Sequence, residues 1–271
     1  MRRSEPGASA GRGDIQSVRR ALSLLMSFSR ERPELGVNEL ARAHGLHRSS
    51  VSRLLATLAD AGFVRVDPIS GRYRLGLALL ERAGLLLLQM DIRAIAQPIM
   101  HELAPRGEET VTLAALDGLE AVVIEQASPA RPCRFVSWPG RRVPLHATAH
   151  GKVLLAFREP AERDRMLARL VDADGRFPRL TAATITTAEA LAEELRLTRE
   201  RGYGLAMMEM DRDLAGVATP VFDHNGQVVA SVSLSGPAFR YQPEHVTFLA
   251  SLIVEGGRRL SRELGWQGPA T

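Results

Sequence analysis

The stretch Gly45-Leu-His-Arg-Ser-Ser-Val-Ser-Arg-Leu-Leu55 decides the fold of the first part of this 271-residue chain. Apolar residues in this stretch, together with Leu58 just after it, recur at i, i+3, i+4 and i+7. This spacing predicts a helix over about 47–61 with one buried stripe formed by Val51, Leu54, Leu55 and Leu58. The opposite face carries hydroxyls and arginines, namely Arg48, Ser49, Ser52 and Arg53, with Ser50 beside them. At the N-terminal end of a helix, such side chains suit the major groove, where they contact phosphates and guanine edges.

Two further helical patterns come before this stretch. The first covers about 15–30, where apolar residues recur at helical spacing at Val18, Leu22, Leu25 and Phe28. The second is short, from Val37 to His44, with Gly36 as N-cap and Glu39 in the position of a capping-box partner. Gly45 ends it at a tight turn. Two short helices, a glycine turn and a third helix predict a helix-turn-helix.

A β-hairpin is predicted directly after the third helix. Alternating apolar residues flank Asp67-Pro-Ile-Ser-Gly71, a turn-forming sequence. This hairpin would form a wing with Arg65, Arg72 and Arg74 available to the sugar-phosphate backbone. A small helical bundle with a solvated basic surface is the alternative for any single arginine. The complete order of elements favours a winged helix-turn-helix over residues 15–76, with double-stranded DNA as its partner.

Charge is distributed unevenly along the chain. Residues 1–76 contain thirteen arginines and seven acidic residues, a net charge of +6, whereas the remainder has a net charge of −2. A basic end on a nearly neutral body indicates a polyanion-binding module attached to a second domain.

Composition excludes several classes of protein. With 45% hydrophobic and 24% charged residues, the chain has the composition of a soluble globular protein. The densest apolar run, Leu85 to Leu88, is far shorter than the ~20 residues of a transmembrane helix, and residues 1–12 show no secretory signal. The single cysteine, Cys133, excludes an internal disulfide. We therefore expect a cytoplasmic protein without a membrane partner.

The second part of the chain predicts an α+β domain. A leucine-rich linker helix over 77–90 would support the domains or form a dimer contact. The domain itself would span 91–265 and be followed by a short tail at 266–271. At the other end of the chain, we expect a disordered tail at 1–14 before the DNA-binding module. Strand-like segments are expected at 110–116, 121–125, 133–136, 205–208, 217–222 and 228–234, and helices at 92–103, 148–157, 160–171, 187–201 and 243–264. Strands joined by hairpins, with helices inserted, are typical of α+β folds.

No catalytic set emerges from the sequence. Gly151-Lys152 lacks the remaining residues of a phosphate-binding loop, and Ser233 and Ser235 lie in no nucleophile elbow. His146 and His150 have the i, i+4 spacing of zinc ligands, but no acidic residue or cysteine stands at a matching offset. We therefore expect no metal, no cofactor and no enzyme. The rival hypotheses are a hydrolase-like enzyme with an appended DNA-binding module and a purely architectural DNA-binding protein.

Motifs along the chain resemble those of the IclR-type bacterial transcriptional regulators. In the N-terminal part these are residues 45–55, Gly62-Phe63 and Tyr73-Arg-Leu-Gly76; further on they are Pro144-Leu-His-Ala-Thr-Ala-His-Gly-Lys-Val-Leu-Leu155, Gly202-Tyr203, Glu209, Val217-Ala-Thr-Pro-Val221, Gly226 and Ser233-Leu-Ser-Gly-Pro237. The resemblance implies a winged helix and a GAF-like antiparallel-sheet domain that binds a small effector. It also implies homodimers or dimers of dimers. The sequence leaves repression and activation open.

The resemblance also implies an effector pocket. In the family, the positions that match Ala149, His150, Leu214, Ser233 and Ser235 line it, and Ala206 and Gly216 match further pocket positions. Phe135 and Val143 are candidates for an apolar wall. The alternatives are an edge strand with solvated hydroxyls for the two serines and an ordinary core position for Leu214.

The chemistry of these positions favours a carboxylate as effector. A helix that begins at about 147–150 would offer free N–H groups and its dipole to an anion. Ser233 and Ser235 would point to the same face of a strand. The chain has Ala206 where the family often has an acidic residue and Gly216 where it often has cysteine. We expect this to leave space for an effector bulkier than a two- or three-carbon acid, with His150 as a donor that could be cationic near neutral pH.

Overall fold

Three helices and a two-stranded wing form from the first quarter of the sequence. The computed structural model describes residues 15–29, 31–88, 91–131 and 134–268, so the tail predicted at 1–14, Cys133 and the last three residues lie outside it. The chain divides into two units, residues 1–89 and 90–271, and each is described by itself.

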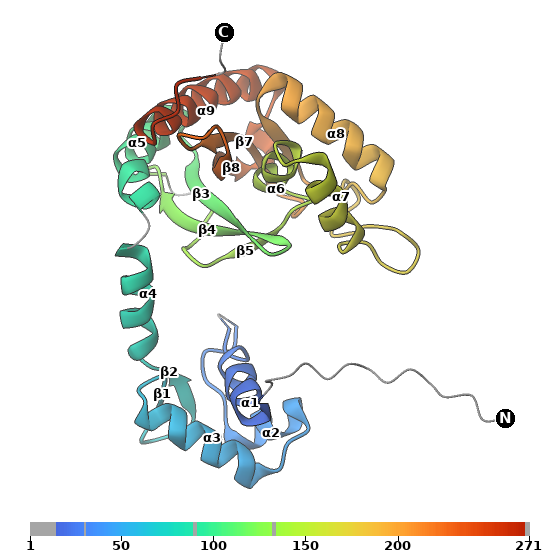
Figure 1. Cartoon of the computed structure of the whole chain (residues 1–271). Helices are drawn as coiled ribbons and strands as arrows, with labels where there is room; N and C mark the ends of the chain where they lie inside the picture. Colours follow the sequence, from blue (N-terminus) through green and yellow to red (C-terminus); the bar gives the residue numbers. More distant parts are fainter. Residues whose placement is uncertain (1–14, 30, 89–90, 132–133, 269–271) are drawn as a thin grey trace, which may run out of the picture. The chain divides into compact units, whose positions relative to one another are not determined.

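The first unit has the predicted order of elements (Figure 1). Helices α1 (Gln16–Leu25), α2 (Val37–His44) and α3 (Arg48–Asp60) precede an antiparallel hairpin of β1 (Val64–Val66) and β2 (Tyr73–Leu75), and helix α4 (Ala78–Leu88) follows. The core is formed by Leu24, Leu35, Leu40, Val51, Leu55 and Val64.

The ends of α2 and α3 follow from local chemistry. The Gly36 N–H donates to the Glu39 carboxylate at 2.9 Å, and Gly45 adopts a left-handed conformation with φ of 61°. That conformation is accessible to glycine at little cost, which is why the helix stops there. His47 caps α3 because its ring Nδ1 accepts from the Ser49 N–H at 3.3 Å.

The prediction for the first helix was wrong in its end, and part of its apolar face is exposed. Helix α1 stops at Leu25, and Val18 and Leu22 are 53% and 56% exposed, whereas Leu24 is fully buried. Helical spacing identifies an apolar face, but it does not say which neighbour covers that face.

The second unit contains a six-stranded antiparallel sheet in the order β5-β4-β3-β8-β7-β6. Its strands are β3 (Thr110–Asp117), β4 (Glu120–Ala127), β5 (Arg142–Pro144), β6 (Gly204–Met207), β7 (Leu214–Phe222) and β8 (Val228–Pro237). The strand predicted at 133–136 was wrong: residues 134–136 form none, and β5 pairs with β4 in its place. The apolar Phe135 belongs to a loop and lines a pocket, so its burial is unrelated to strand pairing.

The two faces of this sheet differ in chemistry. One face carries large apolar side chains, among them Val111, Leu113 and Leu234, and packs against α5 (Asp91–Gly107) and α9 (Pro243–Glu263), which lie side by side (Figure 1). The other face carries glycine, alanine, serine and threonine and packs against α6 (Ala149–Ala156). Helix α6 can approach this face closely because Gly204 has no side chain. A Cβ atom at Gly204 would lie only 2.8 Å from the Ala149 carbonyl oxygen.

The remaining elements complete the domain. These are α7 (Pro160–Ala168), α8 (Ala188–Arg201) and the short 3-10 helix η1 (Ala238–Arg240). Among them, α8 packs against α6. Trp266, assigned from the sequence to a tail, stacks on Phe222 with ring centroids 4.6 Å apart. Within the described ranges, no helix is both long and apolar enough to cross a bilayer. The predicted α+β class is confirmed.

Candidate functional site

A small pocket lies between the small-residue face of the sheet, the first turn of α6 and the loop after β4. Eight of the nine predicted effector positions line it: Phe135, Val143, Ala149, His150, Ala206, Leu214, Gly216 and Ser235. The ninth, Ser233, is fully buried and does not line the pocket itself, but its hydroxyl lies 3.3 Å from the hydroxyl of Ser235. The pocket is also lined by residues that were not predicted from the sequence, including Thr112, Ser137 and Glu209.

The first turn of α6 points into this pocket. Thr148 caps the helix: its hydroxyl accepts from the Gly151 N–H at 3.1 Å and donates to the Pro144 carbonyl at 2.7 Å. The N–H groups of Ala149 and His150 have no acceptor within the helix, because the first turn of any helix leaves its N–H groups without intrahelical partners. Backbone donors and the positive end of the helix dipole therefore lie in the pocket wall.

The imidazole of His150 is neutral, which corrects the expectation of a cationic donor. Its Nε2 atom lies 2.8 Å from the Thr112 hydroxyl and 3.0 Å from the Ser233 hydroxyl, and its Nδ1 atom lies 3.1 Å from the Ser231 hydroxyl. Burial without an acidic partner lowers the pKa of His150 to about 4. The ring therefore orients three hydroxyls under the pocket and adds no charge to it.

Gly216 makes room for the hydroxyl of Ser235. The two residues pair across β7 and β8, and a Cβ atom at Gly216 would lie 2.7 Å from the Ser235 Oγ. The space that the sequence analysis assigned to the effector at this position is therefore partly taken by the serine side chain.

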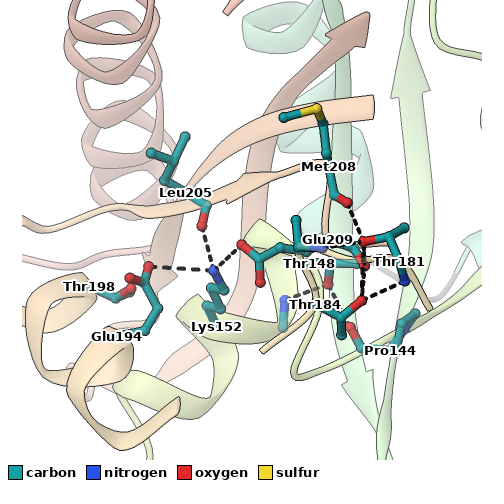
Figure 2. A network of polar contacts seen from close by, with 12 residues as sticks. Pro144, Thr148, Lys152, Thr181, Thr184, Glu194, Thr198, Leu205, Met208 and Glu209 are labelled. Atoms are coloured by element: carbon teal, nitrogen blue, oxygen red, sulfur yellow. Dashed lines mark hydrogen bonds and ion pairs between the residues drawn. The ribbon is translucent and has the colours of Figure 1, made fainter. Parts of the chain in front are cut away.

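A buried ion pair borders the pocket on the β6 side (Figure 2). The Lys152 ammonium lies 2.6 Å from Glu209 Oε1 and 3.6 Å from Glu194 Oε1, and it donates to the Leu205 carbonyl at 2.7 Å. Burial raises the pKa of Glu209, and the adjacent Lys152 opposes this shift. Glu209 was identified from the sequence only as part of a family motif, because nothing in the local sequence shows which side chain contacts Lys152.

The two histidines of the discarded zinc hypothesis point to different partners. His146 stacks on Phe177, and its Nε2 atom lies 2.9 Å from the Pro178 carbonyl oxygen, whereas His150 contacts the hydroxyls of the sheet. Over the described part of the chain, no three His, Cys, Asp or Glu side chains are grouped as metal ligands.

The predicted DNA-binding residues lie on two surfaces of the first unit. On α3, Arg48, Ser49, Ser52 and Arg53 are exposed opposite the buried Val51 and Leu55, and Ser50 is half-buried. In the wing, two of the three predicted arginines have acidic partners: Arg72 lies 2.9 Å from Glu39, and Arg74 contacts Glu34 and Asp67. These ion pairs connect the wing to α2 and to the segment before it.

A winged helix-turn-helix joined to a domain with a pocket of mixed apolar and polar lining is the architecture of a ligand-responsive, DNA-binding transcriptional regulator. Residues 17–68 match the sequence model of the IclR helix-turn-helix domain, and residues 85–262 match that of the bacterial transcriptional regulator IclR C-terminal domain. The chain belongs to the IclR family of transcriptional regulators.

Similar proteins agree with this assignment. The chain is 36% identical over 252 residues to the HTH-type transcriptional regulator XynR of Escherichia coli K12, covering 93% of this chain and 98% of XynR. It is 30% identical over 266 residues to the HTH-type transcriptional repressor AllR of Salmonella typhimurium LT2, covering 98% of this chain and 95% of AllR. Among solved structures, an IclR homologue of Microbacterium hydrocarbonoxydans in complex with 4-hydroxybenzoate aligns with a TM-score of 0.75 and 26% identity, over 92% of this chain and all of that one. The chain is thus a regulator and not an enzyme, and its C-terminal unit is an effector-binding domain.

Proposed function

We propose that this regulator represses transcription by binding an operator through α3 and the wing, and that a small organic carboxylate in the C-terminal pocket controls its affinity for DNA. The observation that carries the effector class is the wall of the pocket, where the first turn of α6 and the Ser235 hydroxyl come together. Backbone N–H groups at a helix start and a hydroxyl donor are well suited to a carboxylate.

Repression, assembly and location are part of the same proposal. The relative AllR is named a repressor, which supports repression here. Exposed apolar side chains on α1 and α4, such as Leu22 and Leu80 at 56% and 69% exposure, support pairing of two chains through their first units, as a homodimer or dimer of dimers. A protein that acts on operator DNA is expected in the cytoplasm.

The neutral His150 supports an effector of modest size and single negative charge. Since the imidazole carries no charge, the anion would be held by dipoles and hydrogen bonds alone. The apolar part of the effector would contact Val143, Phe135 and Leu214, which belong to the same pocket. The homologue with bound 4-hydroxybenzoate supports an acid of about this size.

Control of DNA affinity would follow from linkage. An effector shifts the affinity of the dimer for DNA only by the difference between its affinities for the DNA-binding arrangement and the alternative arrangement.

Calorimetry on the full-length protein tests the effector class. The panel contains benzoate, 4-hydroxybenzoate, 4-fluorobenzoate, butyrate, pentanoate and 4-hydroxybutyrate, with the corresponding neutral amides as controls. We expect acids to bind and amides to bind at least about tenfold more weakly, since the anion loses charge-assisted hydrogen bonds. Equal binding of an acid by wild type and by the Ser233→Ala/Ser235→Ala variant would place the site elsewhere.

DNA binding is tested with an operator fragment defined by footprinting. Arg53→Ala is expected to weaken binding by roughly 1–3 kcal/mol if the side chain contacts a base. Arg82→Ala on α4, which removes an exposed arginine outside α3, serves as the control. Unchanged operator affinity in a folded Arg53→Ala protein would mean that α3 is oriented differently.

A further inference from the structure

The tip of the wing carries the most exposed large apolar side chain among the residues that the structure describes. Ile69 lies in the loop between β1 and β2, and its exposed fraction is 97%. A single exposed apolar residue is common on protein surfaces and needs no explanation by itself. The position of Ile69 within its turn is what gives it significance.

The other residues of this turn are explained by local structure. Asp67 Oδ1 accepts hydrogen bonds from the backbone N–H groups of Ile69 at 3.1 Å and Ser70 at 2.8 Å, and from the Ser70 hydroxyl at 3.0 Å. Pro68 restricts its own φ angle, and Gly71 adopts a left-handed φ of 66° that favours glycine. Isoleucine is not among the residues that favour turns, and its side chain lies in solvent. The fold therefore gives no reason for an isoleucine at this position, whereas a contact with another molecule does.

The first unit holds this side chain at a fixed place relative to α3. Val64 of β1 belongs to the same core as Leu55 of α3. On the second strand, Arg72 lies 2.9 Å from Glu39 of α2. The turn is ordered before any contact forms, and the branched side chain of Ile69 has few rotamers to lose. A contact made by Ile69 therefore has a low entropic cost.

The charges near the tip favour DNA as the molecule that Ile69 contacts. Arg65 of β1 is exposed and has no ion-pair partner among the described residues, and it lies opposite Arg74 in the hairpin. Asp67, the acidic residue of the turn, is compensated because its Oδ2 lies 3.4 Å from the Arg74 guanidinium. Arginines beside an apolar tip match the phosphates that border a groove of DNA.

The dimensions of the two grooves select the minor groove for this tip. Helix α3 is proposed to occupy the major groove, and the next groove along the duplex is the minor one. The minor groove is only about 6 Å wide, so it excludes a helix but admits one side chain at the end of a turn. The acceptor atoms of its floor occur in A·T and in G·C pairs, and the N2 amino group of guanine alone distinguishes them. Isoleucine cannot accept a hydrogen bond from that amino group.

We propose that Ile69 enters the minor groove of the operator beside the segment bound by α3 and selects A·T base pairs there. At a G·C pair, the apolar side chain would displace water from the amino group and leave this donor without an acceptor. At an A·T pair, no such donor is present. This inference rests on the proposed binding of an operator through α3 and the wing, and it adds a specificity-determining residue to that function.

Base analogues test the proposal because they separate the two grooves. Fluorescence anisotropy measures the affinity of the full-length protein for operator fragments in which each A·T pair is replaced singly by G·C or by inosine·C. Inosine·C has the major-groove groups of G·C but lacks the amino group in the minor groove. At the base pairs under the wing, we expect G·C to weaken binding about tenfold and inosine·C to bind within about twofold of A·T. Diaminopurine·T, which adds the amino group to an A·T pair, should bind as weakly as G·C.

Substitutions at Ile69 show whether this side chain causes the discrimination. In Ile69→Ala, the side chain is too short to reach the floor of the groove, and the loss caused by G·C should fall to about threefold or less. In Ile69→Gln, the amide oxygen can accept from the amino group, and the loss should fall in the same way. Neither substitution removes a buried contact, because Ile69 lies in solvent in the free protein.

Two further variants serve as controls. Arg65→Ala removes a cation from the same hairpin, so it should weaken binding to A·T and G·C fragments equally and leave their ratio unchanged. Val229→Ala removes an exposed branched side chain from β8 in the second unit, and it should change neither the affinity nor the ratio.

The outcomes separate this inference from the proposed function. If inosine·C binds as weakly as G·C at every sensitive base pair, those pairs are read in the major groove and the role of Ile69 is refuted. The role is also refuted if the discrimination persists in Ile69→Ala, or if this variant changes only the oligomeric state. In these cases wild type still binds its operator, and the proposed function stands. If wild type prefers no footprinted fragment over random DNA, the proposed function fails, and the inference fails with it.

Discussion

The Nε2 atom of His150 lies 3.0 Å from the hydroxyl of Ser233, so a buried contact joins the first turn of α6 to the central strand β8. Because Ser233 also lies within 3.3 Å of Ser235, the contact extends to the pocket wall. The position of the proposed carboxylate donors therefore depends on a histidine that stays uncharged.

The stability of the protein should decrease in mild acid because of His150. The unfolded chain takes up a proton at this residue near its ordinary pKa of 6.5, whereas the folded state resists protonation down to about pH 4. The contribution is therefore complete above pH 6.5 and is lost as the pH falls from 6.5 to 4, by up to roughly 3 kcal/mol. Urea unfolding of wild type and His150→Gln over this pH range measures it. His101→Gln, an exposed histidine on α5, is the control and should retain the wild-type slope.

A methyl group at Gly216 should weaken carboxylate binding through Ser235. In Gly216→Ala, the new Cβ would lie 2.7 Å from the Ser235 Oγ, which has to move. We expect acids to bind about tenfold more weakly, with a loss similar to that in Ser235→Ala. The double variant should bind no more weakly than either single variant, because both remove the same hydroxyl contact. Additive losses in calorimetry would show that the two residues act separately.

Loss of Lys152 should destabilise the fold strongly. Its side chain is 2% exposed, and its ammonium contacts Glu209, so Lys152→Met would leave a buried carboxylate without its partner. The free energy of unfolding should fall by about 3–5 kcal/mol. Lys152→Met/Glu209→Met, which removes both charges, should recover most of that loss in urea titrations. A double variant as unstable as the single one would mean that packing around Lys152, and not the charge pair, is what matters.

The wing arginines allow two interpretations that salt dependence can distinguish. If Arg72 contacts a phosphate, Arg72→Ala should weaken binding to all sequences similarly and reduce the slope of log affinity against log salt by about one unit. Glu39→Gln removes the ion-pair partner but keeps the arginine, so it should leave this slope unchanged. An unchanged slope in Arg72→Ala would limit Arg72 to its contact with Glu39.

The elements with regular apolar spacing were predicted well from the sequence. Helix α3, with Val51 and Leu55 in the core, follows from apolar residues at helical spacing. The hairpin at Gly118 follows from a local pattern of strand residues on both sides of a turn. Helix α6 also begins where it was expected, because Thr148 is a good N-cap in any context.

The predictions that failed depended on neighbours remote in sequence. Leu22 has helical spacing but is 56% exposed among the described residues. His150 was expected to carry charge, and only the three-dimensional structure shows that it faces hydroxyls in a dry environment. The contact of Glu209 with Lys152 was not recognised because 57 positions separate the two residues.

The division of the sheet into two unlike faces has a consequence for evolution. Val217 and Leu234 hold the domain together from one side, whereas their neighbours Gly216 and Ser235 border the pocket on the other. Substitutions at pocket positions such as Ala206 and Leu214 can therefore alter chemical selectivity while the core behind them is preserved. One scaffold can diversify into sensors for many metabolites, and directed evolution of a biosensor from this chain would begin with a library on that face alone.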